Sequence, residues 1–203
     1  MAELRNVCVY CGSNDGTSPE YAAAAQILGR DIAEAGIRLI YGGGSVGLMG
    51  IVARTVLEND GKVTGIIPQF LKDREVMLGE ASELVVTADM HERKRIMFER
   101  ADAFVALPGG IGTLEEVVEM MTWAQLDQHE KPILIANVNG FWDPLVDQFR
   151  RMADDGFLRK DFLGEHVALP VRFCDSAEDV IPTLQDAVAD LPQPALDERA
   201  GLM

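Results

Sequence analysis

The sequence predicts an α/β protein with a Rossmann-like, doubly wound parallel sheet and helices on both faces. Short apolar runs alternate along the chain with amphipathic stretches, which is the order that β-α-β units produce. The apolar runs are nearly continuous, as in strands that are covered on both faces. The chain has 203 residues, 48% of them apolar, which suits one sizeable core. We expect a single α/β domain at 1–190 and a C-terminal tail at 191–203.

Seven apolar runs are predicted strands. Gly42 breaks the second of them and Pro108 stops the fifth, because glycine and proline interrupt regular structure. The segment 70–82 is ambiguous and loop-like. The predicted strands are 7–10, 37–41, 62–67, 83–87, 103–107, 132–136 and 167–169.

The amphipathic stretches between these runs are predicted helices. In the first of them, Ser18 is the expected N-cap, Pro19 takes the first helical position and Gly36 closes the helix. Gly61 ends the second in the same way. The predicted helices are 19–35, 48–59, 90–100, 113–126, 142–155 and 177–189.

Charge and hydropathy restrict the classes of partner. No apolar run approaches the roughly 20 residues that span a bilayer, and the first residues lack a signal-peptide pattern. We therefore expect a cytoplasmic protein without a membrane partner. The net charge of −15 opposes binding to nucleic acid. A small anionic ligand remains compatible with it, because helix N-termini and local cations can hold one.

Cys8 and Cys11 form a C-x-x-C pattern. A zinc site would need a second pair of ligands, and the other candidates are scattered along the chain: His91, His129, His166 and Cys174. Free cysteine is often buried. We expect both thiols to pack at the end of a buried strand, with no metal and no cofactor.

The strongest local pattern joins the fifth predicted strand to a helix, in the run Leu107-Pro108-Gly109-Gly110-Ile111-Gly112-Thr113-Leu114-Glu115-Glu116. Glycines let the backbone approach a ligand closely, and the N–H groups of a starting helix suit a phosphate. The alternative is a capping box, with Thr113 as N-cap and Glu116 reaching back. A capping box does not require three glycines within four residues.

A second glycine-rich segment, Gly42 to Gly47, formally matches G-x-G-x-x-G. As a dinucleotide signature the match is weak, because it follows the second strand and no acidic residue follows to hold a ribose hydroxyl. A dehydrogenase is therefore disfavoured. We interpret the segment as a close-approach loop lining the same cleft.

The helix that begins at Met90 opens with the densest positive cluster of the chain. A solvated face with local ion pairs is the alternative interpretation. However, this helix starts where the fourth strand ends, at the ligand edge of the predicted sheet, and an arginine there can clamp a ligand oxygen. Arg93 and Glu116 then stand on two helices that start at one rim, which suggests acid–base or electrostatic work.

Met90, Arg93 and Lys94, followed by Pro108 to Glu116, resemble the paired motifs M-x-x-R-K and P-G-G-x-G-T-x-x-E of the LONELY GUY family. The resemblance covers most of the chain and implies a homodimeric cytokinin riboside 5′-monophosphate phosphoribohydrolase with a nucleotide-binding fold. Such an enzyme cleaves the N-glycosidic bond of N6-modified AMP. Sequences of this kind have been labelled lysine decarboxylases, but no lysine here has a recognisable pyridoxal phosphate context.

By carry-over, Arg93 and Glu116 match the catalytic arginine and glutamate of the family. The expected substrate and phosphate contacts are Ser13, Gly43, Glu75, Lys94, Gly109, Gly110, Ile111, Gly112, Thr113, Glu115 and Thr122. Two alternatives stay open: a molybdenum-cofactor or nucleotide carrier without hydrolase activity, and a hydrolase of unmodified AMP. The apolar helix from Leu114 to Leu126 is either wholly buried or part of a dimer face.

Overall fold

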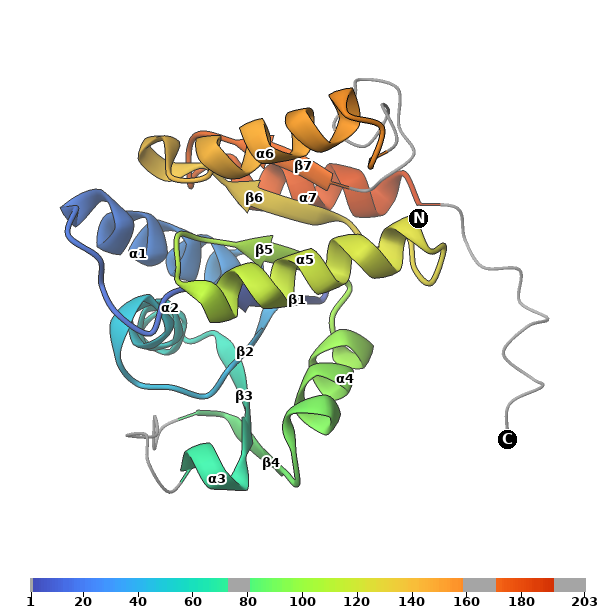
Figure 1. Ribbon diagram of the computed structural model, residues 1–203. Coiled ribbons are helices and arrows are strands. Elements are labelled where there is room, and N and C mark those ends of the chain that lie inside the picture. The colour runs from blue at the N-terminus through green and yellow to red at the C-terminus, as the bar shows by residue number, and fades with distance from the viewer. Residues whose placement is uncertain (1, 73–80, 159–170, 192–203) are drawn as a thin grey trace.

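The computed structural model describes residues 2–72, 81–158 and 171–191. They form a three-layer α/β fold around a seven-stranded parallel sheet of order β4-β3-β2-β1-β5-β6-β7 (Figure 1). This arrangement confirms the predicted fold class. The strands are β1 (Asn6–Tyr10), β2 (Arg38–Tyr41), β3 (Lys62–Pro68), β4 (Glu83–Thr87), β5 (Ala103–Ala106), β6 (Ile133–Ala136) and β7 (Val171–Cys174).

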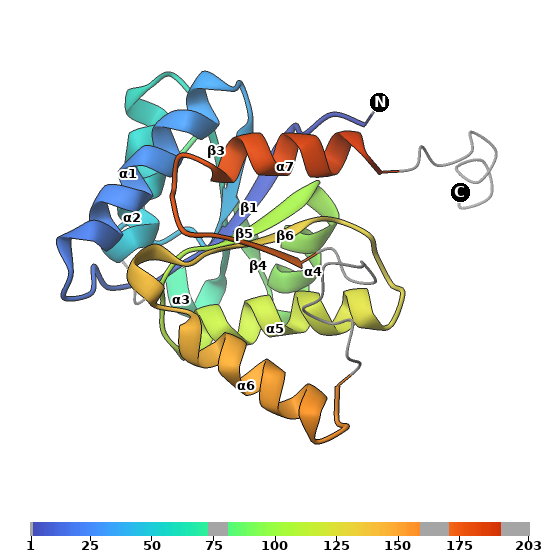
Figure 2. The same ribbon diagram turned by 90° about the horizontal axis from the view of Figure 1, so that it is seen from above.

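Helices cover both faces of the sheet, as Figure 2 shows from above. On one face lie α1 (Pro19–Glu34), α2 (Gly47–Glu58) and α7 (Val180–Ala189). On the other lie α4 (Met90–Arg100), α5 (Ile111–Gln125) and α6 (Asp143–Asp154). The short helices α3 (Gln69–Lys72) and η1 (Val138–Gly140) lie in connections.

Alternation along the strands divides the interior into two cores. In β1, Val7 and Val9 belong to the core beneath α1 and α2, whereas Cys8 and Tyr10 belong to the core beneath α4 and α5. This is the pleat of a strand with two covered faces. The predicted burial of Cys8 and Cys11 is confirmed, and both thiols are free. Burial raises the pKa of both thiols well above its ordinary value, so neither is poised as a nucleophile.

Local signals explain both ends of α1. Ser18 accepts a hydrogen bond from the Glu20 amide and Pro19 opens α1, as predicted. Gly36 follows that helix with φ of +69°, a left-handed conformation that favours glycine.

Three expectations need correction. The helix predicted at 113–126 begins earlier, at Ile111, with Gly110 as N-cap and no side-chain cap, so the alternative of a capping box at Thr113 does not form. The helix predicted at 177–189 begins only at Val180. The helix α3, at Gln69–Lys72, overlaps the start of the segment 70–82 that was interpreted as a loop. The strand predicted at 167–169 lies outside the described residues, and the strand that the structure contains, β7, follows at Val171–Cys174.

Candidate active site

The glycine-rich turn after β5 lies at the topological switch point of the sheet. β1 pairs with β2 on one side and with β5 on the other, so the connections leaving β1 and β5 diverge there, where α/β proteins commonly bind ligands. The Gly12 amide donates to the Pro108 carbonyl at 3.0 Å. The N–H groups that open α5 have no side-chain cap, and they are the groups that suit an anion.

A pocket of about 220 Å³ opens at this point. Its lining combines the backbone of the turns after β1 and β5 with two aromatic rings, and the residues are Gly12, Ser13, Asn14, Asp15, Gly16, Tyr21, Leu48, Pro108, Gly109, Gly110 and Phe141. Tyr21 and Phe141 meet edge to face at 5.7 Å between ring centroids. Their part in the pocket has no local pattern in the sequence, because they come from distant segments.

The second glycine-rich segment packs against the first turn. Gly47 has φ of +63°, and a Cβ there would collide with the Ser13 backbone. The Met49 amide donates to the Gly12 carbonyl at 3.2 Å. The segment thus makes the close backbone approach that we interpreted from the sequence, whereas the pocket lining includes only the residue that follows it, Leu48.

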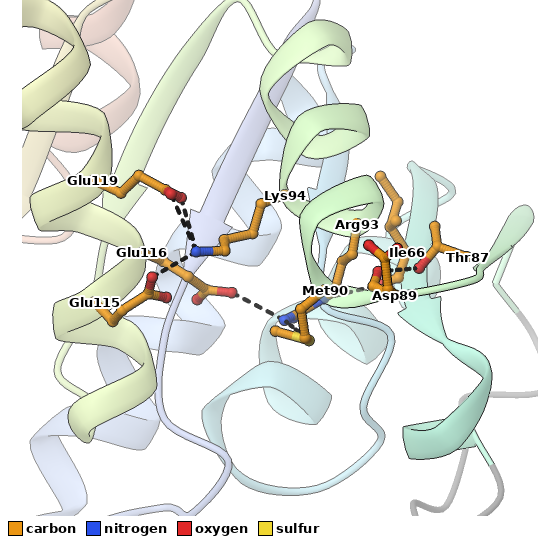
Figure 3. Close-up of polar contacts among 9 residues, drawn as sticks. All are labelled: Ile66, Thr87, Asp89, Met90, Arg93, Lys94, Glu115, Glu116 and Glu119. Atoms are coloured by element: carbon orange, nitrogen blue, oxygen red, sulfur yellow. Dashed lines mark hydrogen bonds and ion pairs between the residues drawn. The ribbon is translucent and has the colours of Figure 1, made fainter.

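Arg93 and Glu116 meet across the gap between α4 and α5 (Figure 3). Arg93 Nη1 lies 3.2 Å from Glu116 Oε1, and the two side chains are only 10% and 12% exposed. Arg93 Nε also donates to the Ile66 carbonyl at 3.2 Å, and Nη1 contacts Met90 Sδ at 3.9 Å. A Cβ at Gly42 would collide with Arg93 Nη2, so a larger residue there would displace this guanidinium from its observed position.

The electrostatics of Glu116 result from two opposed effects. Burial raises the pKa of the Glu116 carboxyl above its ordinary value, and the Arg93 guanidinium acts in the opposite direction. Glu116 thus combines a raised pKa with a fixed cation beside it, on the helix that follows the glycine-rich turn. These are properties of a catalytic carboxyl group.

Lys94, next to Arg93 on α4, also reaches α5. Its Nζ lies 2.5 Å from Glu115 Oε1 and 3.1 Å from Glu119 Oε2, as Figure 3 shows. Burial alone would lower the pKa of the Lys94 ammonium, but the contacts with both carboxylates raise it above its ordinary value. Glu119 was not among the residues predicted for the site.

The remaining predicted contacts are distributed around the pocket and along α5. Ser13, Gly109 and Gly110 line the pocket, whereas Gly43 is buried against Ile67 of β3 with φ of +84°. On α5, Ile111 and Gly112 are exposed, Thr113 is buried, and Thr122 is exposed and donates to the Val118 carbonyl at 2.8 Å. Glu75 lies outside the described residues.

The described residues form neither a metal-binding cluster nor a membrane-spanning helix. Among residues 2–72, 81–158 and 171–191, no group of three or more His, Cys, Asp or Glu side chains is arranged to hold a metal ion. Within this part of the chain, no helix combines the length and apolar character needed to cross a bilayer.

The fold and the turn at its switch point define a Rossmann-like α/β protein. Residues 49–184 match the family described as "Possible lysine decarboxylase". The chain is 48% identical over 155 residues to the probable cytokinin riboside 5′-monophosphate phosphoribohydrolase LOGL1 of Oryza sativa subsp. japonica, covering 76% of this chain and 70% of that protein. It is 46% identical over 157 residues to the cytokinin riboside 5′-monophosphate phosphoribohydrolase LOG7 of Arabidopsis thaliana, covering 77% and 72%. The chain therefore belongs to the LONELY GUY (LOG) family.

Solved structures of other proteins are similar to this chain in fold. The molybdenum cofactor carrier protein of Chlamydomonas reinhardtii has a TM-score of 0.67 at 21% identity, covering 93% of this chain and 99% of that one. The molybdenum cofactor binding protein of Rippkaea orientalis has a TM-score of 0.66 at 23% identity, covering 91% and 98%. At these identities the likeness concerns the fold alone.

Proposed function

We propose that this protein hydrolyses the N-glycosidic bond of adenosine 5′-monophosphates, with or without a substituent on N6, and releases the free base and ribose 5-phosphate. The observation that carries the proposal is the buried Arg93–Glu116 pair, in which Glu116 belongs to the helix that opens without a side-chain cap. The named activity of relatives at 46–48% identity supports the same reaction.

In the proposed complex the phosphate occupies the pocket at the switch point, where the N–H groups that open α5 face it. Binding energy from this remote group then positions the glycosidic bond. In this part of the proposal the expected contacts bind the phosphate. They are Ser13, Gly109, Gly110, Ile111, Gly112 and Thr113.

The chemical step breaks the bond between C1′ and the base nitrogen. The bonding electrons leave with the base, which takes up a proton, while positive charge builds on the ribose as in other glycoside hydrolysis. A water oxygen adds to C1′ and loses its proton. The Glu116 carboxylate stabilises the developing charge and orients this water, and Arg93 holds that carboxylate in place and favours its ionised form.

The test is incubation with AMP and with N6-isopentenyl-AMP, following free base and ribose 5-phosphate by chromatography. The ratio of the two rates decides between a cytokinin-activating enzyme and a general AMP hydrolase. Release of neither base by folded protein would contradict the proposal and favour a carrier.

A substitution at Glu116 tests whether this side chain takes part in the chemical step. Glu116→Gln is expected to lower turnover by about 10²–10⁴-fold, the usual contribution of an acid–base group, while binding of ribose 5-phosphate persists. Glu99→Gln is the matched control, because Glu99 is exposed and pairs with Arg95 on the outer face of α4. Equal losses of turnover in both variants would contradict the role of Glu116.

We further propose a cytoplasmic homodimer that does not bind nucleic acid, with residues 1–190 as its nucleotide-binding domain. The dimer is supported by the family resemblance, and Ile111 and Leu126, which are 82% and 61% exposed at the two ends of α5, are apolar side chains that such an interface would cover. The net charge of −15 opposes binding of polyanions. Light scattering of the purified protein tests the dimer, and a monomer would contradict it.

A further inference from the structure

Three carboxylates are concentrated near the start of α5. Glu115 and Glu119 are four residues apart and lie on one side of the helix, and Glu116 is adjacent to them. Like charges at this spacing repel each other. Because Glu116 is nearly buried, repulsion from both neighbours acts on it with little screening by solvent.

Helix α4 brings two cations to this cluster. Arg93 contacts Glu116, and the next residue, Lys94, contacts both Glu115 and Glu119 through a side chain that is only 15% exposed. Figure 3 shows the two contacts one above the other in the gap between the helices. The Lys94 ammonium is thus engaged by protein carboxylates.

The carboxylates of the cluster outnumber its cations. Two cations face three carboxylates, so the cluster carries one net negative charge. Without Lys94, Arg93 would be the only cation among these five side chains, and Glu115 and Glu119 would compete with Glu116 for it.

We infer that Lys94 is a positioning residue, which binds Glu115 and Glu119 and so reserves Arg93 for Glu116. The inference rests on the proposed function only in the consequence for turnover. The geometry itself is independent of any substrate.

The surroundings of Glu116 agree with this assignment. Its pKa is raised by burial and lowered by Arg93, and then Glu115 and Glu119 raise it while Lys94 lowers it. The groups on β1 and directly after it that interact electrostatically with Glu116 are Cys8, Tyr10 and Cys11, whose raised pKa values keep them neutral. The charges that decide the state of Glu116 in the described part of the chain therefore lie on α4 and α5.

The first experiment follows the Glu116 carboxyl carbon by NMR as a function of pH in the free protein, with the signal assigned through Glu116→Gln. Lys94→Gln is expected to raise the titration midpoint of Glu116 by about one unit, the lower end of the effect of a nearby opposite charge. In the double variant Lys94→Gln/Glu119→Gln the midpoint of Glu116 should return most of the way to its value in the unmodified protein. Lys94→Arg should leave the midpoint unchanged. Arg95→Gln is the matched control, because it removes a cation from the outer face of the same helix.

Glu119→Gln alone keeps Lys94 and is expected to lower the midpoint, so the inference is testable even if Lys94→Gln fails to fold. An unchanged midpoint in folded Lys94→Gln, or the same shift in Arg95→Gln, would overturn the inference.

The second experiment measures AMP hydrolysis across pH. If Glu116 acts as a carboxylate, the acid limb of kcat/KM should move upward in Lys94→Gln and return in the double variant, with KM little changed. A raised KM with an unmoved NMR midpoint would overturn the inference and make Lys94 a ligand contact. Absence of hydrolysis in the unmodified protein would contradict the proposed function, whereas the NMR result would still decide the role of Lys94.

Discussion

Removal of the Arg93 guanidinium is expected to destabilise the protein strongly near neutral pH and less in mild acid. The substitution Arg93→Met keeps much of the side-chain volume but leaves Glu116, which is 12% exposed, without the cation at 3.2 Å. At that separation the attraction is about 5 kcal/mol for an effective dielectric constant of about 20, largely offset by the loss of hydration. Breaking such a pair from one side typically costs about 3–5 kcal/mol.

The pH dependence follows from the carboxyl left behind. Its ordinary pKa is 4.5, and burial without Arg93 raises the pKa of the folded state further above that value. The folded state then binds a proton more readily than the unfolded chain. The cost is therefore absent below the unfolded pKa, grows as the pH rises above about 4.5, and is complete above the folded pKa.

The assay is urea denaturation of four proteins, namely the unmodified chain, Arg93→Met, Glu116→Gln and the double variant, at about pH 5 and about pH 8. The double variant should lose less stability than the sum of the single variants, because it leaves no unpaired charge. Additive losses that are equal at both pH values would refute the reasoning and show that the two side chains do not interact in solution.

Two further predictions concern the same site. Gly42→Ala places a methyl group against Arg93 and should lower turnover about tenfold or more by displacing the guanidinium, whereas Glu99→Gln, at an exposed position of α4, should be far milder. Steady-state kinetics on both variants tests this, and similar losses would contradict it. The rate should fall on acidification through the raised pKa of Glu116, and a pH profile without an acid limb above about 4.5 would show that the carboxylate form is not required.

The positions of strands and helices were predictable because glycine, proline and capping residues mark where many of them begin and end. The bounds of α4 and β4 agree with the prediction to the residue, since Asp89 caps the helix after a strand ending at Thr87. The start of α5 was predicted too late, because a capping-box pattern competes with a glycine N-cap and the pattern does not reveal which one forms.

The candidate site was predictable in part. The motif residues Arg93 and Glu116 stand in sequence patterns that mark helix starts, and the fold brings them together. Tyr21, Phe141 and Glu119 were missed because their roles depend on contacts between distant segments. The space that Gly42 leaves for a side chain of α4 is likewise a property of tertiary packing.

The backbone of Gly12 joins the two halves of the fold, since its amide donates to Pro108 and its carbonyl accepts from Met49. These partners follow β2 and β5, and the three strands β3, β4 and β5 lie between them in the sequence. During synthesis, the pocket cannot close until β5 has left the ribosome and docked beside β1. Ligand affinity therefore arises late in folding, and fragments that end before the glycine-rich turn should lack the pocket even where β1 to β4 have already paired.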